Sequence, residues 1–440
     1  MPLLLLPYSL ESQALSATTS ERIHGTAPYL TFDGGVTKVT KIEDLLGIKL
    51  SDGRTFTSQN NSSSPTAPIK LPNVGDTLAD IEMIVPPLSD SININDLVTQ
   101  GKWRDDDGDG QGASEITASG SISLAITDKD GNTINRSDAL DICNAPYKVT
   151  LDSSEGTLET RYGMPNSSTF SGGTAEYYIT PPSQPVICAV RPNLDRGIGQ
   201  HAGLASIWNP DKGFLVQSTN PSSYDRNFPT TGADGLYFDL LIAGVDASQL
   251  SWSVTTYGGS GDITATVNWV YSNTRVTLSG PRADSSQISS SSPGSLARPV
   301  LPQTFELVGR DSSGNEVRYG FVLRQWFVHR EYKHDSALNQ TTWCNSLGYR
   351  MPRVRDLTNS NYNNLGATPS SSGNSYMRHI GAGFFTEWGR MYNYTDAGFV
   401  NNVYWTSDAT GSDQFYIRAS NGDIYSVYPN FWLSVLCTAP

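Results

Sequence analysis

Apolar and polar residues alternate with a period of two in short runs along most of the chain. Residues 119–126 and 147–151 show this alternation, and residues 128–132 between them contain an Asp-Gly turn signal. Short alternating runs bounded by turn residues are typical of antiparallel strands joined by hairpins. No helix-period segment of useful length competes with the strands in this region. The pattern predicts a mainly β protein whose first domains are immunoglobulin-like β-sandwiches.

Changes of texture along the chain predict its division into domains. We expect an N-terminal segment over residues 1–27, a β-sandwich-like domain over 28–151, a second β-rich domain over 152–284, a Ser/Pro linker over 285–300 and a C-terminal domain over 301–440. The first segment has a short apolar run but lacks the basic residues of an intact signal peptide. It is interpreted as a clipped signal or as a linker within a longer surface protein.

Composition narrows the class of protein and its partners. The chain has 440 residues and a formal charge of −13, with only 17% charged residues. An acidic chain is a poor partner for nucleic acid, whose phosphates need a basic surface. The 37% hydrophobic and 10% aromatic residues can fill real cores. We expect a β-rich protein that works outside the cytoplasm, at the cell surface, in the outer membrane or in secreted form.

Four cysteines fall into two separated groups, Cys143 with Cys188 and Cys344 with Cys437. Neither group has the spacing of a zinc site. One disulfide in each group, formed in an oxidising compartment, is the favoured interpretation, and four buried thiols are the alternative. The spacing does not decide whether Cys143 and Cys188 pair with each other.

One acidic segment suggests a metal site. Asp105, Asp107 and Asp109 alternate ahead of Gly110, as in the first half of an EF-hand calcium loop. The twelfth position is Ile116 rather than the bidentate Glu that closes such a loop. A bound calcium ion and a solvated acidic turn therefore both remain open, and no cofactor is required.

Signatures of catalysis are weak. The five histidines form no zinc-binding arrangement, and we expect His329 and His334 to lie at the surface. The chain also has no nucleophile elbow and no phosphate-binding loop. Glu387, with Asp396 or Asp408 as a second carboxylate, is the one pair that suits a glycan-active enzyme. A structural carboxylate is the preferred interpretation.

The C-terminal domain carries an ordered series of motifs. A Trp-Cys helix candidate and a Gly-Tyr-Arg-Met-Pro turn occupy residues 341–352, a Tyr-Trp-Thr-Ser strand follows at 404–407, and the last strand contains Val-Leu-Cys at 435–437. The series resembles the C-type-lectin-like modules at the tips of intimin/invasin-type outer-membrane adhesins of enterobacteria. The resemblance is looser over residues 20–300, where it rests on texture and on the segment 208–214.

The resemblance implies an α+β C-type-lectin-like domain over residues 301–440. It also implies that Cys344 and Cys437 lie where the first helix meets the last strand. The calcium and sugar triplets of true C-type lectins do not occur in this domain. Recognition through a calcium-free surface is therefore preferred.

Aromatic residues in Asn- and Pro-containing loops are the candidates for that surface, because loop aromatics are common recognition anchors. The predicted face is formed by Trp388, Tyr392, Asn393, Tyr394, Tyr428, Asn430, Phe431 and Trp432. The predicted function is that of a non-enzymatic adhesin region that binds a protein or glycan of a host or neighbouring cell. A membrane anchor would lie outside this chain. A glycan-active enzyme and a structural biofilm-matrix protein are the alternatives.

Overall fold

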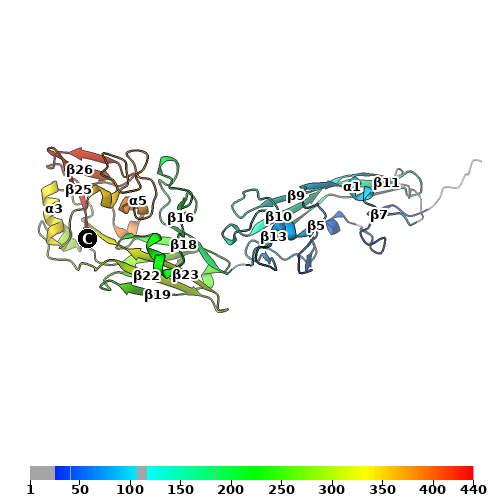
Figure 1. Cartoon of the computed structure of the whole chain (residues 1–440), viewed down its shortest axis with the longest axis horizontal. Helices are drawn as coiled ribbons and strands as arrows, with labels where there is room; N and C mark the ends of the chain where they lie inside the picture. Colours follow the sequence, from blue (N-terminus) through cyan, green and yellow to red (C-terminus); the bar gives the residue numbers. More distant parts are fainter. Residues whose placement is uncertain (1–24, 40, 107–115, 183, 440) are drawn as a thin grey trace, which may run out of the picture. The chain divides into compact units, whose positions relative to one another are not determined.

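The computed structural model describes residues 25–39, 41–106, 116–182 and 184–439, and strands dominate it (Figure 1). The chain forms two compact units, unit 1 (Met1–Pro182) and unit 2 (Ser183–Pro440). The mainly β prediction is confirmed. Among the described residues, no helix has the length and apolar character needed to cross a membrane.

Among its described residues, unit 1 contains one five-stranded sheet, two three-stranded sheets and one two-stranded sheet. The five-stranded sheet has the order β4 (Ile69–Lys70), β13 (Gly173–Thr180), β10 (Tyr147–Ser153), β9 (Ser121–Thr127) and β6 (Ser91–Asn93). The others have the orders β12 (Ser167–Phe170), β11 (Gly156–Thr160), β8 (Ile116–Ser119); β3 (Thr55–Phe56), β2 (Ile48–Lys49), β5 (Glu82–Met83); and β1 (Tyr29–Leu30), β7 (Trp103–Arg104). The helical segments are η1 (Ile42–Leu45), η2 (Leu78–Asp80), α1 (Ile94–Thr99) and η3 (Ile142–Asn144).

Alternation along β9 explains how unit 1 buries its core. Ile122, Leu124 and Ile126 point inward while the residues between them are more exposed. This apolar face shares one core with Ile48 of β2, and the hydroxyl of Tyr177 on β13 donates a hydrogen bond to the Leu46 carbonyl at 2.8 Å. Two layers of sheet therefore enclose the core, as a β-sandwich requires.

The predicted boundary at residue 151 is wrong. Strand β10 pairs with β13 without a break, from Tyr147 opposite Ile179 to Ser153 opposite Gly173. Residues 152–182 therefore complete the sheet of unit 1 and do not begin a second domain. The first compact unit ends at Pro182.

Unit 2 begins with a second sandwich. One sheet has the order β15 (Trp208–Asn209), β16 (Gly213–Leu215), β14 (Val186–Arg191), β18 (Tyr237–Ala243), β21 (Asn273–Ser279) and β20 (Thr264–Val270), and the other has β19 (Ser251–Gly258), β22 (Gln303–Arg310) and β23 (Glu316–Leu323). Buried rings join the two sheets across the core, as where Phe238 meets Phe321 edge-on at 5.8 Å. The short helical segments of this part are η4 (Gly199–His201), η5 (Pro221–Arg226) and η6 (Ala247–Gln249).

The rest of unit 2 is a mixed α and β structure. Its sheet has the order β17 (Thr231–Ala233), β24 (Gln325–His329), β28 (Ser434–Ala439), β25 (Val403–Thr410), β26 (Asp413–Arg418) and β27 (Ile424–Val427). Helical segments are α2 (Ser285–Ser289), α3 (Ala337–Ser346), α4 (Val354–Leu357), α5 (Phe384–Trp388), η7 (Met391–Asn393) and η8 (Thr395–Ala397). The predicted disulfide between Cys344 on α3 and Cys437 on β28 is confirmed, with Cα atoms 5.4 Å apart.

The sandwich and the C-terminal sheet of unit 2 share one continuous core. Strand β17 comes from the sandwich segment of the chain but pairs in parallel with β24 of the C-terminal sheet. The Phe228 and Trp388 rings meet across the junction with centroids 4.9 Å apart. A single hydrophobic cluster accordingly runs from Ile187 to Ala439. These two parts fold as one body.

A fully buried arginine fastens the same junction. The Arg378 guanidinium donates to the carbonyls of Asn193 (2.5 Å), Asp195 (2.8 Å) and Arg196 (3.3 Å) on the sandwich side. It also donates to the carbonyl of Glu387 at 2.8 Å. Charged donors to backbone carbonyls make strong hydrogen bonds in a low-dielectric interior.

Residues 285–300 do not form the predicted free linker. The Trp343 indole N–H of α3 donates to the Gln287 carbonyl at 2.8 Å, and Leu296 N–H donates to the Leu347 carbonyl at 3.0 Å. The serines and prolines of this segment suggested a flexible spacer, but the segment packs against α3. The Ser- and Pro-rich composition therefore belongs to an irregular segment of backbone that is packed in place, not to a flexible linker.

One loop type occurs in both units. Asp128 and Asp311 each accept backbone N–H groups within a five-residue Asp-x-x-Gly-Asn hairpin, where the Asn side chain donates to the same Asp at 2.9 Å and 2.7 Å respectively. Each loop follows a long strand, β9 in unit 1 and β22 in unit 2. The same five-residue Asp-x-x-Gly-Asn loop therefore occurs once in each unit.

Candidate functional site

An exposed aromatic loop connects β27 to β28 in unit 2. In this loop, which comprises residues 428–432 and is called the aromatic loop below, Tyr428 is 62% exposed, Phe431 54% and Trp432 73%. Asn430 lies between them and is also exposed. Large apolar groups that stand in solvent without a partner are typical of interaction surfaces when they occur together. These four residues of the predicted face are exposed, as expected, and receptor binding by them stays a prediction.

The base of the aromatic loop is rigid. Leu433 and Asp335 exchange two backbone hydrogen bonds of 3.1 Å, and Ala337 N–H donates to the Pro429 carbonyl at 2.8 Å. The Gln340 amide of α3 is fully buried and donates to the Leu433 carbonyl at 2.8 Å. The ends of the loop are thus held by the start of α3, so the aromatic side chains can be presented at little cost in conformational entropy.

One further residue, Leu338, belongs to this surface and was not predicted from the sequence. Leu338, in the first turn of α3, is 74% exposed and directly follows Ala337, which is hydrogen-bonded to Pro429 of the aromatic loop. Because α3 has no sharply separated apolar and polar faces, an exposed leucine on it is hard to recognise from the sequence. An apolar residue placed outside the buried face of α3 was the signal that could have revealed it.

The other half of the predicted face is wrong for two of its residues. Trp388 is fully buried, and its indole N–H donates to the Thr231 carbonyl at 3.0 Å. Tyr394 is 1% exposed, and its hydroxyl accepts from Asn193 N–H at 2.8 Å and donates to the Trp388 carbonyl at 3.0 Å. Burial raises the pKa of Tyr394. These rings fill the junction between the sandwich and the C-terminal sheet and cannot reach a partner.

Their neighbours remain partly accessible but are tied to the same junction. Tyr392 is half-buried with the Arg390 guanidinium 5.4 Å from its ring centroid. Asn393 is exposed, and its amide donates to the Asp195 carboxylate at 3.0 Å. The structure does not bring this segment together with the aromatic loop by any contact among the described residues. The candidate surface is therefore reduced to the aromatic loop and the start of α3.

Glu387 is a structural carboxylate. Its side chain is fully buried and accepts hydrogen bonds from the backbone N–H and hydroxyl of Thr230, from the same two groups of Thr231, and from Gly381 N–H, at 2.5–3.1 Å. Burial raises the pKa of Glu387, and the hydrogen bonds from Thr231, Gly381 and Thr230 oppose that rise. A carboxylate enclosed in this way fixes the strand β17 and is closed to a glycan substrate.

The predicted calcium loop falls largely outside the described residues, which exclude Asp107 and Asp109. Asp105 is 5% exposed and accepts from the Thr26 hydroxyl at 3.2 Å. Within the described ranges, no three His, Cys, Asp or Glu side chains are grouped so that they could hold a metal ion. Calcium binding by this segment stays a prediction.

The remaining cysteines lie in different units. Cys143 is in η3 of unit 1, and Cys188 is in β14 of unit 2. Their pairing also stays a prediction.

His201 and His329 are both buried, and burial lowers the pKa of each ring. His329, which was expected at the surface, is 5% exposed; its Nε2 lies 2.7 Å from the Ala397 carbonyl, and its Nδ1 accepts from Glu331 N–H at 3.2 Å. These contacts place the proton on Nε2. Burial lowers the pKa of His329 to about 4. The surface prediction was wrong for His329, because its strand β24 is central in the sheet, and is confirmed for His334.

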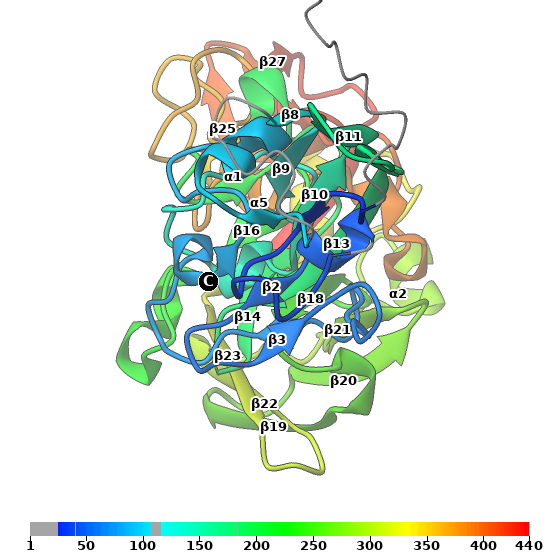
Figure 2. The ribbon, with the colours of Figure 1, turned by 90° about the vertical axis from the view of Figure 1, so that its right-hand side faces the viewer.

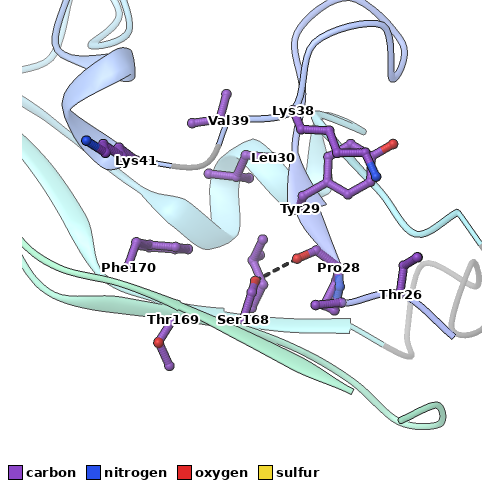
Figure 3. A pocket seen from close by; sticks show the side chains of 12 residues that line it. Thr26, Pro28, Tyr29, Leu30, Lys38, Val39, Lys41, Ser168, Thr169 and Phe170 are labelled. Atoms are coloured by element: carbon purple, nitrogen blue, oxygen red, sulfur yellow. Dashed lines mark hydrogen bonds between the residues drawn. The ribbon is translucent and has the colours of Figure 1, made fainter. Parts of the chain in front are cut away.

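Unit 1 has a small cavity of about 270 Å³ between its first strand and the β11–β12 hairpin (Figure 3). Its walls are mainly apolar and include Pro28, Leu30 and Phe170, with Lys38 and Lys41 at its side. Within the lining of the cavity, the Ser168 hydroxyl donates a hydrogen bond to the Pro28 carbonyl at 2.6 Å. This cavity offers an apolar contact area but no pair of acid and base groups in its lining.

Comparison with known proteins supports the predicted resemblance. Over 114 residues the chain is 28% identical to the inverse autotransporter adhesin YeeJ of Escherichia coli K12, a match that covers 26% of this chain and 4% of YeeJ. This match supports an intimin/invasin-type adhesin region. The chain thus spans a small part of the curated relative that it matches. No family model matches the chain.

Solved structures of two adhesins are also similar. Invasin, described as a bacterial integrin-binding protein, is 15% identical, with a TM-score of 0.37 over 74% of this chain and 50% of invasin. The C-terminal 282-residue fragment of intimin, solved with the intimin-binding domain of Tir, is 11% identical, with a TM-score of 0.31 over 73% of this chain and 99% of the fragment.

Proposed function

We propose that the chain is a non-enzymatic region of a bacterial cell-surface adhesin. In this proposal the C-terminal part of unit 2, a C-type-lectin-like module, binds a receptor on a host or neighbouring cell through the aromatic loop. The two sandwiches act as spacers, and an outer-membrane anchor lies outside this chain. The observation that carries the proposal is the set of exposed rings Tyr428, Phe431 and Trp432 on a hydrogen-bonded base.

The chemistry of the loop suits recognition without a metal ion. Tyr and Trp provide large contact areas at low cost in rotamer entropy, and Asn430 adds adaptable hydrogen bonds. The match with YeeJ, itself described as an adhesin, supports the same class of function. A protein receptor and a glycan receptor both fit this chemistry, and the experiment below separates them.

The test is binding of the purified chain to intact target cells, measured by flow cytometry over a concentration series. Trp432→Ala should weaken binding by at least about 2 kcal/mol, the range of an interface hot spot. Tyr428→Ala should weaken it in the same direction. Tyr271→Ala is a matched control, because Tyr271 is 89% exposed at the β20–β21 turn, which belongs to a different sheet from the aromatic loop. Protease treatment of the cells should abolish binding if the receptor is a protein, and glycosidase treatment if it is a glycan.

The melting temperature distinguishes a binding role from packing. Trp432→Ala should leave the melting curve of unit 2 nearly unchanged, whereas Trp405→Ala, at a fully buried position, should lower stability by about 3–5 kcal/mol. Equal loss of stability in both variants would mean that Trp432 is merely packed. Wild-type binding by both loop variants would remove the aromatic loop as the receptor site.

A further inference from the structure

Strand β20 is an edge strand whose outer side forms no ladder in the described chain, although β19 of the other sheet lies close to it. It is the last strand of its six-stranded sheet, and β21 is its one ladder partner, from Thr264 opposite Ser279 to Val270 opposite Asn273. Figure 2 labels β20 beside β21. A free strand edge exposes a row of backbone donors and acceptors that can pair with another strand.

The turn between β20 and β21 fixes which residues face that free edge. Tyr271 and Ser272 form a two-residue turn with φ of 47° and 63°, the left-handed conformation of a type I′ hairpin. The residues that flank such a turn, Val270 and Asn273, exchange the first pair of hydrogen bonds. Backbone groups then alternate along the strand.

Counting back from Val270 assigns each residue of β20 to one side. Asn268, Thr266 and Thr264 direct their backbone groups to β21, whereas Trp269, Val267 and Ala265 direct theirs away from it. The next residue in the outward series is Ile263, whose carbonyl accepts from the Gln303 amide outside the β20–β21 ladder at 3.0 Å, as this alternation requires. Three positions of outward N–H and C=O groups therefore form the open edge.

Nothing in the sequence of β20 protects this edge. Its seven residues, Thr-Ala-Thr-Val-Asn-Trp-Val, include no charged residue and no proline, which are the usual means of blocking edge pairing. Strand β19, which precedes it, is equally free of charged residues. Trp269 is 49% exposed at one end of the strand. A chain with a charge of −13 repels its own copies in general, but this strand contributes nothing to that repulsion.

We propose that β20 is a homotypic contact through which two copies of this chain associate. The two strands pair antiparallel about a two-fold axis at Val267, so that the sheet continues from one copy into the other. This register brings the outward positions of both copies together as hydrogen-bonded pairs. It sets Trp269 of each copy, which is 49% exposed, opposite Ala265 of the other, a small residue whose side chain is buried against its own core.

The opposite face of the paired strands is equally compatible. Thr266 of one copy stands opposite Asn268 of the other, and both residues are exposed in the single chain. Hydroxyl and amide groups at such positions can form cross-strand hydrogen bonds, and no like charges meet. One strand pair alone is smaller than a stable interface, so association of free chains is weak. Where many copies are displayed on one surface, many weak strand pairs would act together, so the overall association would be stronger through multivalency.

The experiment uses the complete chain in analytical ultracentrifugation at low salt, from micromolar to about millimolar concentration. A double variant, Thr266→Lys with Asn268→Lys, places lysines opposite lysines in the proposed pair. A second double variant, Thr266→Glu with Asn268→Glu, places glutamates opposite glutamates. The control, Thr342→Lys with Asn345→Lys, makes the same substitutions at exposed positions of α3. Melting curves are recorded first, because Asn268 faces Arg275 on β21.

We expect the wild type and the control to dimerise and each charged β20 variant to dimerise at least about tenfold more weakly, with less weakening at high salt. Mixing the two charged variants should restore a dimer of one copy of each. A wild type that stays monomeric throughout would overturn the proposal, and so would dimers that the β20 charges do not affect. If the lysine and glutamate variants form no mixed dimer with each other, the proposal is overturned as well.

This proposal is independent of receptor binding. Trp432→Ala should dimerise like the wild type, because the aromatic loop lies in a different sheet from β20. Loss of self-association in that variant would count against pairing at β20 and leave the receptor proposal to its own test.

Discussion

Replacing the buried carboxylate of Glu387 by an amide should destabilise unit 2 without touching any surface. Five donors converge on its two oxygens, and three of them are backbone N–H groups, from Thr230, Thr231 and Gly381. The two threonine hydroxyls can rotate and become acceptors, but a backbone N–H cannot. Gly381 N–H binds Oε1 and Thr231 N–H binds Oε2, so in either orientation a glutamine turns its NH₂ group toward one of them.

The size of the effect follows from that mismatch. A buried donor left without an acceptor costs about 1–3 kcal/mol, and the remaining hydrogen bonds lose the strengthening that a charged acceptor gives. Removing the charge also relieves its desolvation, which offsets part of the loss. We expect Glu387→Gln to lower the stability of unit 2 by about 2–4 kcal/mol. For a unit of this size this corresponds to a drop in melting temperature of roughly 5–15 °C.

The assay is thermal unfolding followed by near-ultraviolet circular dichroism, because Trp388 and Phe228 pack beside this carboxylate and report on the junction. Asp396→Asn is the matched control, since Asp396 is exposed and belongs to the same C-terminal part. A Glu387→Gln melting temperature within 1 °C of the wild type would refute the anchoring role. Unchanged melting together with loss of activity on a glycan would make Glu387 catalytic instead.

Three other changes test separate parts of the structure. Loss of the disulfide in the double variant Cys344→Ser, Cys437→Ser should cost about 4–5 kcal/mol by the chain-entropy model for a separation of 93 residues, measured by urea denaturation under non-reducing conditions. The free energy of unfolding should be highest above about pH 6.5 and should fall as the pH drops toward 4. The reason is that His329 takes up a proton at a higher pH in the unfolded chain than in the folded chain. The loss of stability from this one residue is about 3 kcal/mol. His329→Asn should flatten that slope in urea denaturation at several pH values, and an unchanged slope would exclude this ring as its source. Isothermal titration with calcium should give one weak site that disappears when Asp105, Asp107 and Asp109 are all changed to Asn, and a flat wild-type titration would leave only the acidic turn.

The sequence pattern predicted those strands and turns that depend on residues close together in the chain. The alternation of β9 and its Asp-Gly turn reappear as strand and hairpin, because each depends on residues within about ten positions. The pairing of Cys344 with Cys437 came from the resemblance of the C-terminal motifs to a known module, and the structure confirms it. The repeated Asp-x-x-Gly-Asn loop at residues 128–132 and 311–315 was visible in the sequence and could have indicated the same turn after a strand in both units.

Features fixed by distant contacts could not be seen in this way. Trp388 and Tyr394 stand near Asn residues, as exposed binding aromatics often do, yet Thr231 and Asn193, more than 150 positions earlier in the chain, bury them. The same applies to residues 285–300, whose composition resembles a linker while α3 covers them. The aromatic loop was predictable because its exposure follows from a short connection between two strands.

The shared core of unit 2 has a consequence for how such chains can be recombined. Strand β17 is encoded some 90 residues before β24, with which it pairs, and three of the four carbonyls that Arg378 binds, those of Asn193, Asp195 and Arg196, lie earlier still. A genetic exchange with a breakpoint near residue 300 would separate the Arg378 guanidinium from its three carbonyl partners in the sandwich and leave β24 paired with β28 alone. A segment exchanged between proteins with its core intact therefore begins near residue 183, so the C-terminal sheet has to be transferred together with the sandwich of unit 2.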